Sequence, residues 1–319
     1  MGTLPQIIEA APVALRPELE DAAAYARAEK AEATRRAYNS DFAAFRAWCE
    51  AKDLIPLPAW PETVAAFLAA EAKRGVKAST IGRRVAAIRY AHKLAGHEPP
   101  TNCEAVKATV RGIRRSIGTA KVRKAPVMAE MARAMASSTP ETLKGLRDRA
   151  LLLLGFAGAF RRSELVALDV ADLEETDDGI RVTIRRSKTD QEGHGETIAV
   201  IRGSGATCPV KAIKAWRKAA GIAEGPLFRA VAKGGRVNGK RLSDRCVAEI
   251  VKAGVGRLGL NAADYSGHSL RSGFLTSAAR RGASVFKMRD VSRHKSMDVL
   301  QGYVRDAELF KDHAGAGLL

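Results

Sequence analysis

The sequence predicts a mainly α-helical protein of two domains, an N-terminal helical bundle and a mostly helical second domain that contains a small antiparallel sheet. Three observations support this fold class. The chain has 319 residues, which exceeds the size at which one hydrophobic core usually stops growing. Apolar residues recur at helical spacing along most of the chain. Two stretches rich in β-branched residues, 180–186 and 197–201, interrupt this pattern in the second half.

The first half of the chain predicts an N-terminal arm at 1–16, which has little periodicity, and a bundle of helices at 17–117. A helix that begins near Thr34 carries an apolar stripe at spacings of four, three and four residues: Tyr38, Phe42, Phe45 and Cys49. Helices at 61–75 and 79–96 each end on glycine, a residue that often follows a helix. Three tyrosines fall on the apolar pattern and are predicted to lie in the core: Tyr25, Tyr38 and Tyr90.

The second half follows a basic stretch at 118–127, which is poor in large apolar groups and contains Pro126, so we expect the interdomain linker there. Residues 141–173 predict a buried helix followed by a shorter one. The two β-branched stretches predict a β-hairpin, because a polar segment with glycines joins them. Further helices are predicted at about 209–220, 241–258, 269–281, 284–291 and 297–303.

The charge of the chain points to nucleic acid. Lysine and arginine number 53 against 35 acidic residues, which gives a net charge of +18. Such a surplus attracts polyanions, so duplex DNA or RNA is the favoured partner, although an anionic membrane surface would also fit. The sequence has no run of 18 or more apolar residues, no signal peptide and no lipidation motif. We therefore expect a cytoplasmic protein without a membrane partner.

Metal and cofactor sites are not expected. The four cysteines, Cys49, Cys103, Cys208 and Cys246, lie far apart without a C-x-x-C pair, so the sequence encodes neither a zinc site nor a disulfide framework. It also lacks a G-x-x-x-x-G-K-[ST] phosphate loop and a cluster of carboxylates that would hold a metal ion. The chemistry of the protein is therefore predicted to need no cofactor.

Two short motifs in the second domain combine arginine with an acid or a base. Arg161 precedes Glu164 by three residues, and His268 precedes Arg271 by three, so each pair shares a helix face if its segment is helical. Two arginines from separate segments can clamp one phosphodiester, because each guanidinium can donate two parallel hydrogen bonds to phosphate oxygens. These residues predict a phosphate site built without a metal ion.

Tyr303 is a candidate nucleophile close to the C-terminus. Its hydroxyl has an unperturbed pKa of about 10, so it needs an electropositive surrounding and a proton acceptor, for which His268 is suited. Attack on phosphorus would form a phosphotyrosine and expel a 5′ oxygen, to which Lys188 on the hairpin can donate a proton. The phosphotyrosine would retain the free energy of the broken bond, so religation needs no ATP. His294 lies nine residues before Tyr303, about half a turn out of phase on one helix, so a break between them is expected.

These residues stand in motifs that resemble those of the tyrosine recombinase (phage integrase) family, which includes the Cre-type recombinases. AFRRSEL resembles the first arginine motif, RRSKTD the hairpin-lysine motif, GHSLRSG the H-x-x-R motif and SRHKSMDVLQGYV the closing motif. The order and spacing of the motifs make the resemblance specific, and it covers nearly the whole chain. In two departures from the pattern, Arg293 stands where the usual Gly-His has glycine, and Phe160 and Arg162 replace commoner residues of the first motif.

The resemblance implies a catalytic set to which all four motifs contribute: Arg161, Glu164, Lys188, His268, Arg271, His294 and Tyr303. Two arginines and His294 would stabilise charge on the non-bridging phosphate oxygens while Tyr303 attacks. It also implies a core-binding domain at 17–117, a catalytic domain at 128–319 and a C-shaped clamp of both on duplex DNA. A homotetramer would join two inverted-repeat sites, exchange strands through a Holliday junction and exchange the segment 306–319 between protomers. An accessory protein is a further partner that the sequence leaves open.

Several assignments stay open at this point. Arg162 competes with Arg161, although the spacing to the acidic residue favours Arg161. Lys211 and Arg186 compete with Lys188 as the proton donor. A type IB topoisomerase would share the chemistry without a defined site, and a DNA-binding protein that has lost catalysis would share the fold. Seven basic residues are candidate phosphate contacts or merely solvated side chains: Arg35, Arg36, Arg83, Arg84, Lys121, Arg123 and Lys124.

Overall fold

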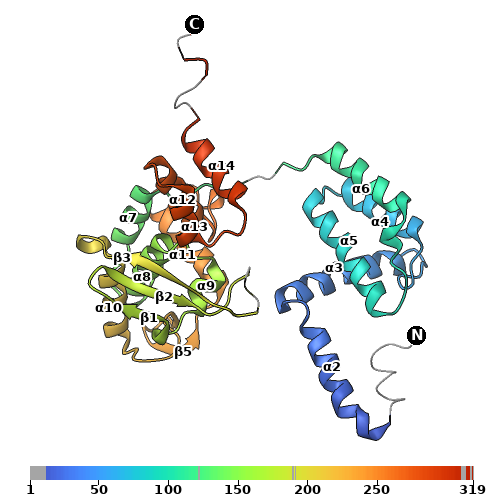
Figure 1. The fold of residues 1–319 in the computed structure, drawn as a ribbon, viewed down its shortest axis with the longest axis horizontal. Helices are drawn as coiled ribbons and strands as arrows, with labels where there is room; N and C mark the ends of the chain where they lie inside the picture. The colour runs from blue at the N-terminus through green and yellow to red at the C-terminus, as the bar shows by residue number, and fades with distance from the viewer. Residues whose placement is uncertain are drawn as a thin grey trace. The chain divides into compact units, whose positions relative to one another are not determined.

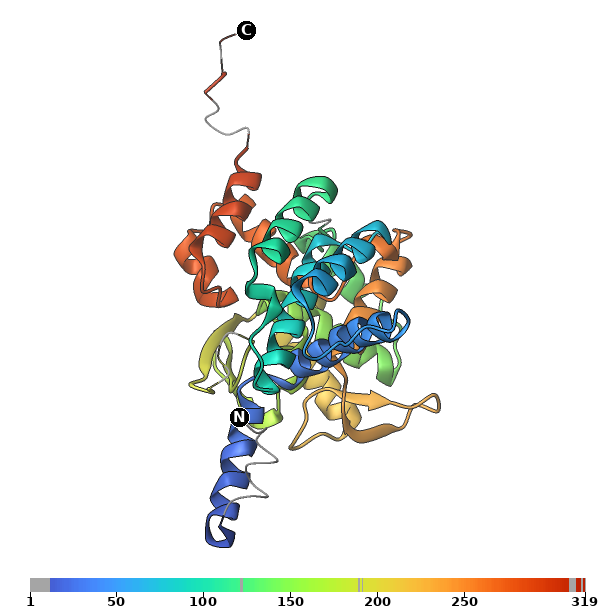
Figure 2. The same ribbon diagram turned by 90° about the vertical axis from the view of Figure 1, so that its right-hand side faces the viewer.

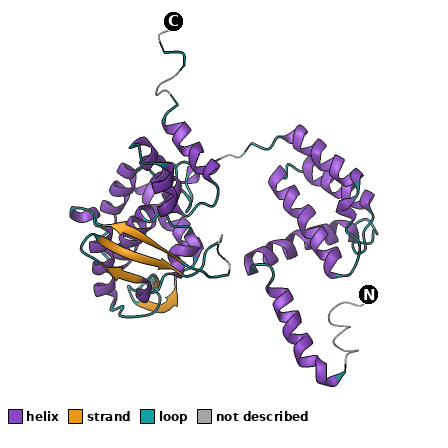
Figure 3. Ribbon diagram, viewed as in Figure 1, coloured by secondary structure: helices purple, strands orange, loops and turns teal. Residues whose placement is uncertain are grey.

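The computed structural model describes residues 12–120, 123–188, 190, 192–309, 314–316 and 318. The chain divides between Val122 and Arg123 into two compact units (Figure 1). Both units are mainly helical, and every strand of the described residues lies in the second unit (Figure 3). The predicted mainly α fold with a small antiparallel sheet is therefore confirmed. In the described part of the chain, no helix is long and apolar enough to cross a membrane.

The first unit is a helical bundle. Its elements are η1 (Val13–Leu15), α2 (Arg16–Ala28), α3 (Glu32–Glu50), α4 (Pro61–Lys73), α5 (Ala78–Leu94), η2 (Pro100–Asn102) and α6 (Glu104–Ile117). The core forms where α3, α4, α5 and α6 pack together, around the fully buried side chains of Phe45, Phe67, Leu68 and Ile88. The apolar stripe predicted on α3 supplies Phe45 and Cys49 to this core, because those positions share one face of the helix.

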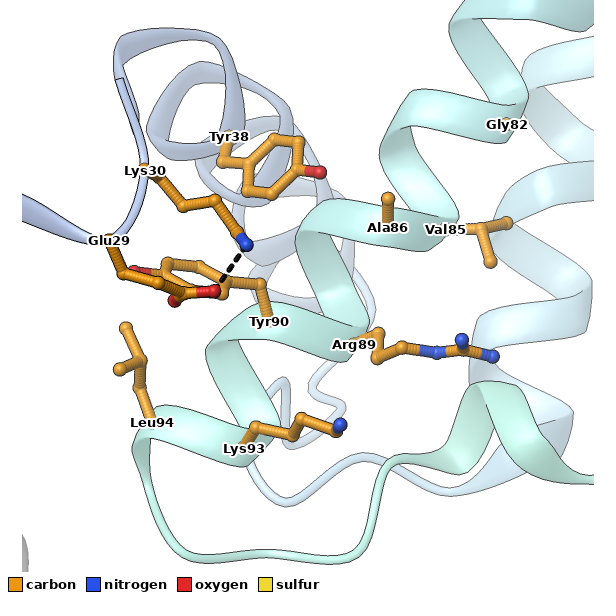
Figure 4. A pocket seen from close by; sticks show the side chains of 10 residues that line it. All are labelled: Glu29, Lys30, Tyr38, Gly82, Val85, Ala86, Arg89, Tyr90, Lys93 and Leu94. Carbon is orange, nitrogen blue, oxygen red and sulfur yellow. Dashed lines mark hydrogen bonds and ion pairs between the residues drawn. The ribbon is translucent and has the colours of Figure 1, made fainter. Parts of the chain in front are cut away.

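The predicted core position of Tyr25 is wrong. Tyr25 is 78% exposed, because α2 runs away from the other helices of the unit and Ala23 is the one buried apolar side chain described on it (Figure 1). Tyr38 of α3 and Tyr90 of α5 are half-buried, with their ring centroids 5.5 Å apart. They line a pocket of about 510 Å³ at the surface of the bundle, beside an ion pair between Glu29 and Lys30 (Figure 4). An apolar pattern thus identifies a helix face but not whether a neighbour covers it.

The second unit contains both sheets. Its helices are α7 (Ala129–Ser137), α8 (Leu143–Ala157), α9 (Arg162–Ala167), η3 (Val170–Asp172), η4 (Gly205–Thr207), α10 (Pro209–Ala220), α11 (Asp244–Arg257), η5 (Ala262–Asp264), α12 (Ser269–Arg280), α13 (Val285–Ser292) and α14 (Met297–Ala307). Its strands are β1 (Leu173–Glu175), β2 (Gly179–Ile184), β3 (Glu196–Ile201), β4 (Arg229–Val231) and β5 (Val237–Arg241). Strands β1, β2 and β3 pair antiparallel in that order. Their pairing, with Gly179 opposite Ile201 and Ile184 opposite Glu196, confirms the predicted hairpin.

The antiparallel hairpin of β4 and β5 was not predicted. Strand β5 has the sequence VNGKR, and all its side chains beyond Val237 are exposed. A strand without alternating apolar residues gives no periodic signal, and β4 has only three residues. Figure 2 shows this hairpin at the edge of the second unit, where few side chains need to be buried.

The main core of the second unit forms around α8. Its leucine run is buried against α7, α10 and α12, with Leu151, Leu152 and Leu154 fully enclosed. Trp216 of α10 is also fully buried, and its indole N–H donates a hydrogen bond to the Leu227 carbonyl at 2.8 Å. A helical segment that is apolar on all sides is expected to lie inside a domain, which explains the burial of the second half of α8.

A second, smaller hydrophobic cluster lies apart from this core. It consists of Leu275, Ala279, Met288 and Leu300, which we call the α14 cluster. It joins α12, α13 and α14, and the half-buried ring of Tyr303 packs against it. The C-terminal helix is therefore held by a core of its own.

The end of the expected linker lies on the second unit. The N–H of Ala125 donates to the Asp264 carbonyl at 2.8 Å, and the N–H of Val127 donates to the Ser269 carbonyl at 2.8 Å. These bonds fix the chain against the start of α12. Gly273 of α12 leaves room for this contact, since a β carbon there would lie 1.7 Å from the Val127 carbonyl oxygen.

We expect Gly273→Ala to destabilise the second unit by about 1–3 kcal/mol, because α12 or the Val127 backbone must move to admit the methyl group. Urea denaturation followed by circular dichroism measures the change. Gly256→Ala on α11 is the matched control, since a β carbon there meets nothing within 4 Å. That control should be neutral or stabilising by up to about 1 kcal/mol. If Gly273→Ala and the wild type have the same free energy of unfolding, the Val127 backbone can move to admit the methyl group without loss of stability.

Candidate active site

The first segment of the site lies where the chain leaves α8 and enters α9. Ala159 turns the chain there with a positive φ of 46°. Arg161 takes the N-cap position of α9. The carboxylate of Glu164, in the first turn, accepts the backbone N–H of Arg161 at 2.9 Å and pairs with its guanidinium at 2.5 Å. Arg162, the alternative to Arg161, is 43% exposed and lies 3.8 Å from the Asp244 carboxylate. The structure therefore places Arg161, and not Arg162, with the buried acid.

The second segment of the site opens α12. His268 is the N-cap residue of this helix and is exposed, whereas Arg271, one turn further on, is 1% exposed. Nη1 of Arg271 donates to the Ala159 carbonyl at 2.6 Å, and Nη2 lies 3.2 Å from Nδ1 of His294. Burial, and then the charge of Arg161, lower the pKa of Arg271 to about 9, so its guanidinium is still protonated at neutral pH.

The third segment is the loop between α13 and α14, which holds His294. The predicted break between His294 and Tyr303 is confirmed, because α13 ends before this loop and α14 begins after it. Nδ1 of His294 lies 2.9 Å from the Ser292 hydroxyl as well as 3.2 Å from Arg271. Burial, and then the charge of Arg271, lower the pKa of His294 to about 3, so the ring is neutral at neutral pH. Nη2 of Arg271 lies 3.5 Å from Nε2 as well, and since an arginine can only donate, the ring nitrogen that faces it is an acceptor.

Tyr303 and His268 belong to the same site, because the charges of its arginines shift the pKa values of both side chains. Burial raises the pKa of the Tyr303 hydroxyl, and the charges of Arg123 and Arg271 act in the opposite direction. The phenol is therefore neutral at neutral pH and has two guanidinium groups close enough to influence it. His268 shows part of its surface to solvent, yet the protein atoms around its ring, and then Arg271 and Arg161, lower the pKa of His268. At neutral pH His268 is an uncharged imidazole that can accept a proton.

Two family models divide the chain in the same way as the structure. The description "Phage integrase family" matches residues 127–309, and "Phage integrase, N-terminal SAM-like domain" matches residues 23–98. The chain belongs to the phage integrase family. The first of these matches contains every segment of the site, and the resemblance of the four sequence motifs to this family is confirmed.

Curated relatives support the same assignment. The chain is 41% identical over 290 residues to an integrase/recombinase xerD homolog of Selenomonas ruminantium, across 89% of this chain and 85% of that protein. It is 26% identical to the recombinase cre of Escherichia phage P1, across 82% of this chain and 80% of that protein. Among solved structures, a lambda integrase dimer bound to a COC′ core site shares the fold, with a TM-score of 0.62, 18% identity, and coverage of 91% of this chain and 76% of that one. The prediction that this integrase family member is a tyrosine recombinase is therefore confirmed.

Lys188 lies in the loop between β2 and β3 and is exposed. Of its two competitors, Arg186 is exposed in the same loop and Lys211 is exposed on α10. The hydrogen bonds described above unite Arg161 with Glu164 and Arg271 with His294. The role of Lys188 as a proton donor stays a prediction.

Two predicted phosphate contacts of the first unit are held by acidic residues. Arg84 pairs with the buried carboxylate of Glu71, and its guanidinium lies 5.5 Å from the centroid of the Phe67 ring. Arg84 is therefore held within the bundle, where Arg74 also pairs with Glu71 at 2.7 Å, and its contact with phosphate stays a prediction. Arg83 donates two hydrogen bonds to Asp41, at 2.6 and 3.1 Å, while 49% of its side chain stays exposed.

The other predicted contacts keep their basic groups near solvent. Arg36, Arg123 and Lys124 are exposed, and Arg35 is half-buried. Lys121 lies outside the described residues. Their contact with phosphate stays a prediction.

One residue of the site is absent from the sequence-based set. The sequence shows Arg293 only as a departure from the glycine of the closing motif. The structure buries it to 5% exposure, with Nη2 2.8 Å from the Glu164 carboxylate. The substitution itself was the available signal, because a buried arginine must find an acid and Glu164 is the acid of the first motif.

Proposed function

We propose that the chain cleaves and rejoins duplex DNA at a specific site through a covalent bond between Tyr303 and a 3′ phosphate. The observation that carries the proposal is the convergence of Arg161, Arg271 and His294 from three separate segments, with the charge of Arg271 close enough to lower the pKa of the Tyr303 hydroxyl. Three donors of this kind suit a phosphate whose negative charge grows during attack. The net charge of +18 suits a polyanionic substrate.

The scissile phosphate would be bound by the two arginines and the neutral histidine. The Nε–H of Arg271 is buried and finds no acceptor among the described residues, so it is available to a phosphate oxygen. Arg161 keeps one guanidinium nitrogen on Glu164, which leaves other N–H groups of its fork for a ligand. A neutral His294 carries one ring N–H, which it would donate to a phosphate oxygen.

The chemical step transfers the phosphoryl group from one oxygen to another. Oη of Tyr303 forms a bond to phosphorus, and its proton passes to His268. The bond between phosphorus and the 5′ oxygen breaks, and that oxygen takes a proton from Lys188. Attack by the 5′ hydroxyl of another strand reverses these steps and releases Tyr303. One phosphodiester is replaced by a phosphotyrosine of similar energy, so no ATP is consumed.

The lowered pKa of His268 predicts how cleavage depends on pH. A base works when it is deprotonated, so the rate falls only when the pH drops through the lowered pKa. An unperturbed imidazole with a pKa of 6.5 would be about one quarter deprotonated at pH 6. We expect the single-turnover cleavage rate to fall less than this between pH 7.5 and pH 6, because the pKa of His268 is lowered. A fall to about one quarter would show that the base titrates with an unperturbed pKa.

The assembly that we propose follows the resemblance. A homotetramer joins two sites with inverted repeats, exchanges strands through a Holliday junction, and passes the segment 306–319 between protomers, with an accessory protein as a further partner. We place its activity in the cytoplasm. The proposed domains are the core-binding domain at 17–117, the linker at 118–127 and the catalytic domain at 128–319. Basic residues that are exposed or half-buried would contact phosphates of the duplex: Arg35, Arg36, Arg83, Arg84, Arg123 and Lys124.

The proposal is tested by covalent trapping. The protein is mixed with a pool of random duplexes that carry nicks, so that the cleaved fragment diffuses away and the phosphotyrosine cannot be resealed. Denaturation and protease digestion then recover DNA that carries a peptide. We expect the peptide to contain Tyr303 and the recovered DNA to be enriched in one sequence with an inverted repeat.

Two other outcomes would favour the alternative functions. An adduct on Tyr303 without sequence enrichment, together with relaxation of supercoiled plasmid by the monomer, would identify a type IB topoisomerase. Retained DNA binding without any adduct would identify a DNA-binding protein that has lost catalysis. If no adduct forms, the trapping experiment is repeated with the DNA sequence that the protein selects in a binding assay. This control shows whether the protein lacks catalytic activity or whether the random pool lacked its target sequence.

A further inference from the structure

Two departures from the family pattern contact each other in the structure. Arg293 stands where the closing motif usually has glycine, and Phe160 replaces a commoner residue of the first motif. The guanidinium carbon of Arg293 lies 5.3 Å from the centroid of the Phe160 ring, so the two unusual residues form a cation–π pair. They lie 133 positions apart in the chain. Their contact indicates that the two departures form one interacting pair and are not independent changes.

The backbone of Arg293 adopts a conformation that favours glycine. Arg293 ends α13 with φ 58° and ψ 41°, in the left-handed region that side chains rarely occupy. Three side-chain contacts hold it there: the Glu164 carboxylate at 2.8 Å, the Gly158 carbonyl at 3.3 Å and the Val291 carbonyl. An unfavourable conformation persists when its surroundings fix it, and such positions are frequent at functional sites.

Arg293 and Arg161 share one buried carboxylate. Oε2 of Glu164 accepts from Nη2 of Arg293 at 2.8 Å and from the backbone N–H of Arg161 at 2.9 Å. Oε1 of the same carboxylate accepts from Nη1 of Arg161 at 2.5 Å. Nη2 of Arg161 then reaches back to the Arg293 carbonyl at 3.4 Å, which closes a ring of three residues. The next residue after that carbonyl is His294.

We propose that Arg293 is a positioning residue for strand cleavage, which fixes Glu164 so that Arg161 faces the scissile phosphate and fixes the backbone that places His294 on Arg271. This inference rests on the proposed function. Glycine at this position would allow the same backbone but would leave Glu164 with one arginine. The charge of Arg293 also reaches the phosphate donors, because it contributes to the lowered pKa values of Arg271 and His294. Arg293 therefore adds positive potential to the phosphate site without touching the substrate.

The test compares Arg293→Met with Arg289→Met, which removes the same charge from an exposed position on the same helix. Each variant is mixed at saturating concentration with the nicked duplex selected by the wild type, and the rate of covalent adduct formation is measured in a single turnover. We expect Arg293→Met to slow adduct formation by about 10- to 100-fold, the usual cost of losing a residue that orients a ligand-binding group. Arg289→Met should keep the wild-type rate. Arg293→Lys keeps the charge but loses the stacked, forked geometry, so it should recover part of the rate.

A second substrate separates positioning from general damage. A methylphosphonate at the scissile position carries no negative charge, so its cleavage depends less on Arg161. The deficit of Arg293→Met should shrink on this substrate, and an equal deficit on both substrates would overturn the inference. So would an Arg293→Met rate equal to that of Arg289→Met. If Arg293→Met does not fold, as judged by thermal unfolding, the same comparison of substrates is made with Arg293→Lys. No adduct with the wild type would overturn the proposed function, and this inference with it.

Discussion

Tyr303→Phe is expected to abolish covalent adducts with DNA while keeping the affinity for the same duplex within about twofold of the wild type. The phenyl ring can keep its packing against the α14 cluster, so the fold of this region is preserved. Only the hydroxyl oxygen is lost, and that oxygen is the atom that bonds to phosphorus in the proposed reaction. A denaturing gel of the nicked duplex measures the adduct, and fluorescence anisotropy measures the affinity.

Tyr265→Phe is the matched control for this substitution. Tyr265 is a half-buried tyrosine of the same unit that packs against the main core, and it belongs to none of the catalytic motifs. Its phenylalanine variant should form adducts at the wild-type rate. An adduct that persists in Tyr303→Phe would identify a different nucleophile and would remove the proposed mechanism.

Glu164→Gln is expected to lower the free energy of unfolding of the second unit by about 3–5 kcal/mol. The substitution keeps the shape of the side chain but removes the one negative charge that pairs with both Arg161 and Arg293. Burial alone would raise the pKa of Glu164, but the charges and hydrogen bonds of these two arginines outweigh it, and the pKa is lowered. The ionised carboxylate of Glu164 therefore stabilises the folded state relative to the unfolded chain.

The same carboxylate gives this stability a pH dependence. Because the pKa is lower in the folded state, the stabilisation is complete above the unfolded value of about 4.3 and is lost as the pH falls through the lowered folded value. The difference in unfolding free energy between the wild type and Glu164→Gln should thus be largest at neutral pH and shrink below pH 4. Urea denaturation at several pH values measures it. Glu174→Gln, which removes a 68% exposed partner of Arg181, should cost less than about 1 kcal/mol. Equal costs for the two variants would show that Glu164 is not needed as a charge.

The parts of the fold that could be predicted depend on local patterns. The stripe on α3 places Phe45 and Cys49 in the core, and the hairpin of β2 and β3 follows from two β-branched stretches with a polar connection. The candidate site could be predicted because Arg161, Arg271 and their neighbours stand in motifs whose order is specific. Spacing within a motif survives in the structure, since helix geometry relates residues three apart.

The parts that could not be predicted depend on partners that are distant in the chain. Arg84 resembles a solvated basic residue until Glu71 is known to be buried beside it. Arg293 pairs with Glu164, which lies 129 positions away in the chain, and no sequence pattern near either residue predicts this ion pair. Tyr25 shows the opposite case, since its helix has an apolar face that the bundle does not cover. A single sequence specifies which side chains need partners, but not which partners they find.

The α14 cluster gives the nucleophile an energetic independence from the rest of the catalytic unit. Among the described residues, the α14 cluster has only four buried apolar side chains, whereas the main core is much larger and encloses α8, α10 and the sheet. Local opening of a segment costs only the free energy of the contacts that the segment makes, so we expect α14 to open at a lower cost than the main core. In the proposed reaction, Tyr303 would attack only while α14 is in place, so this local equilibrium would set the fraction of time in which cleavage is possible. A surface that covers α14 would raise that fraction, and one that displaces α14 would lower it.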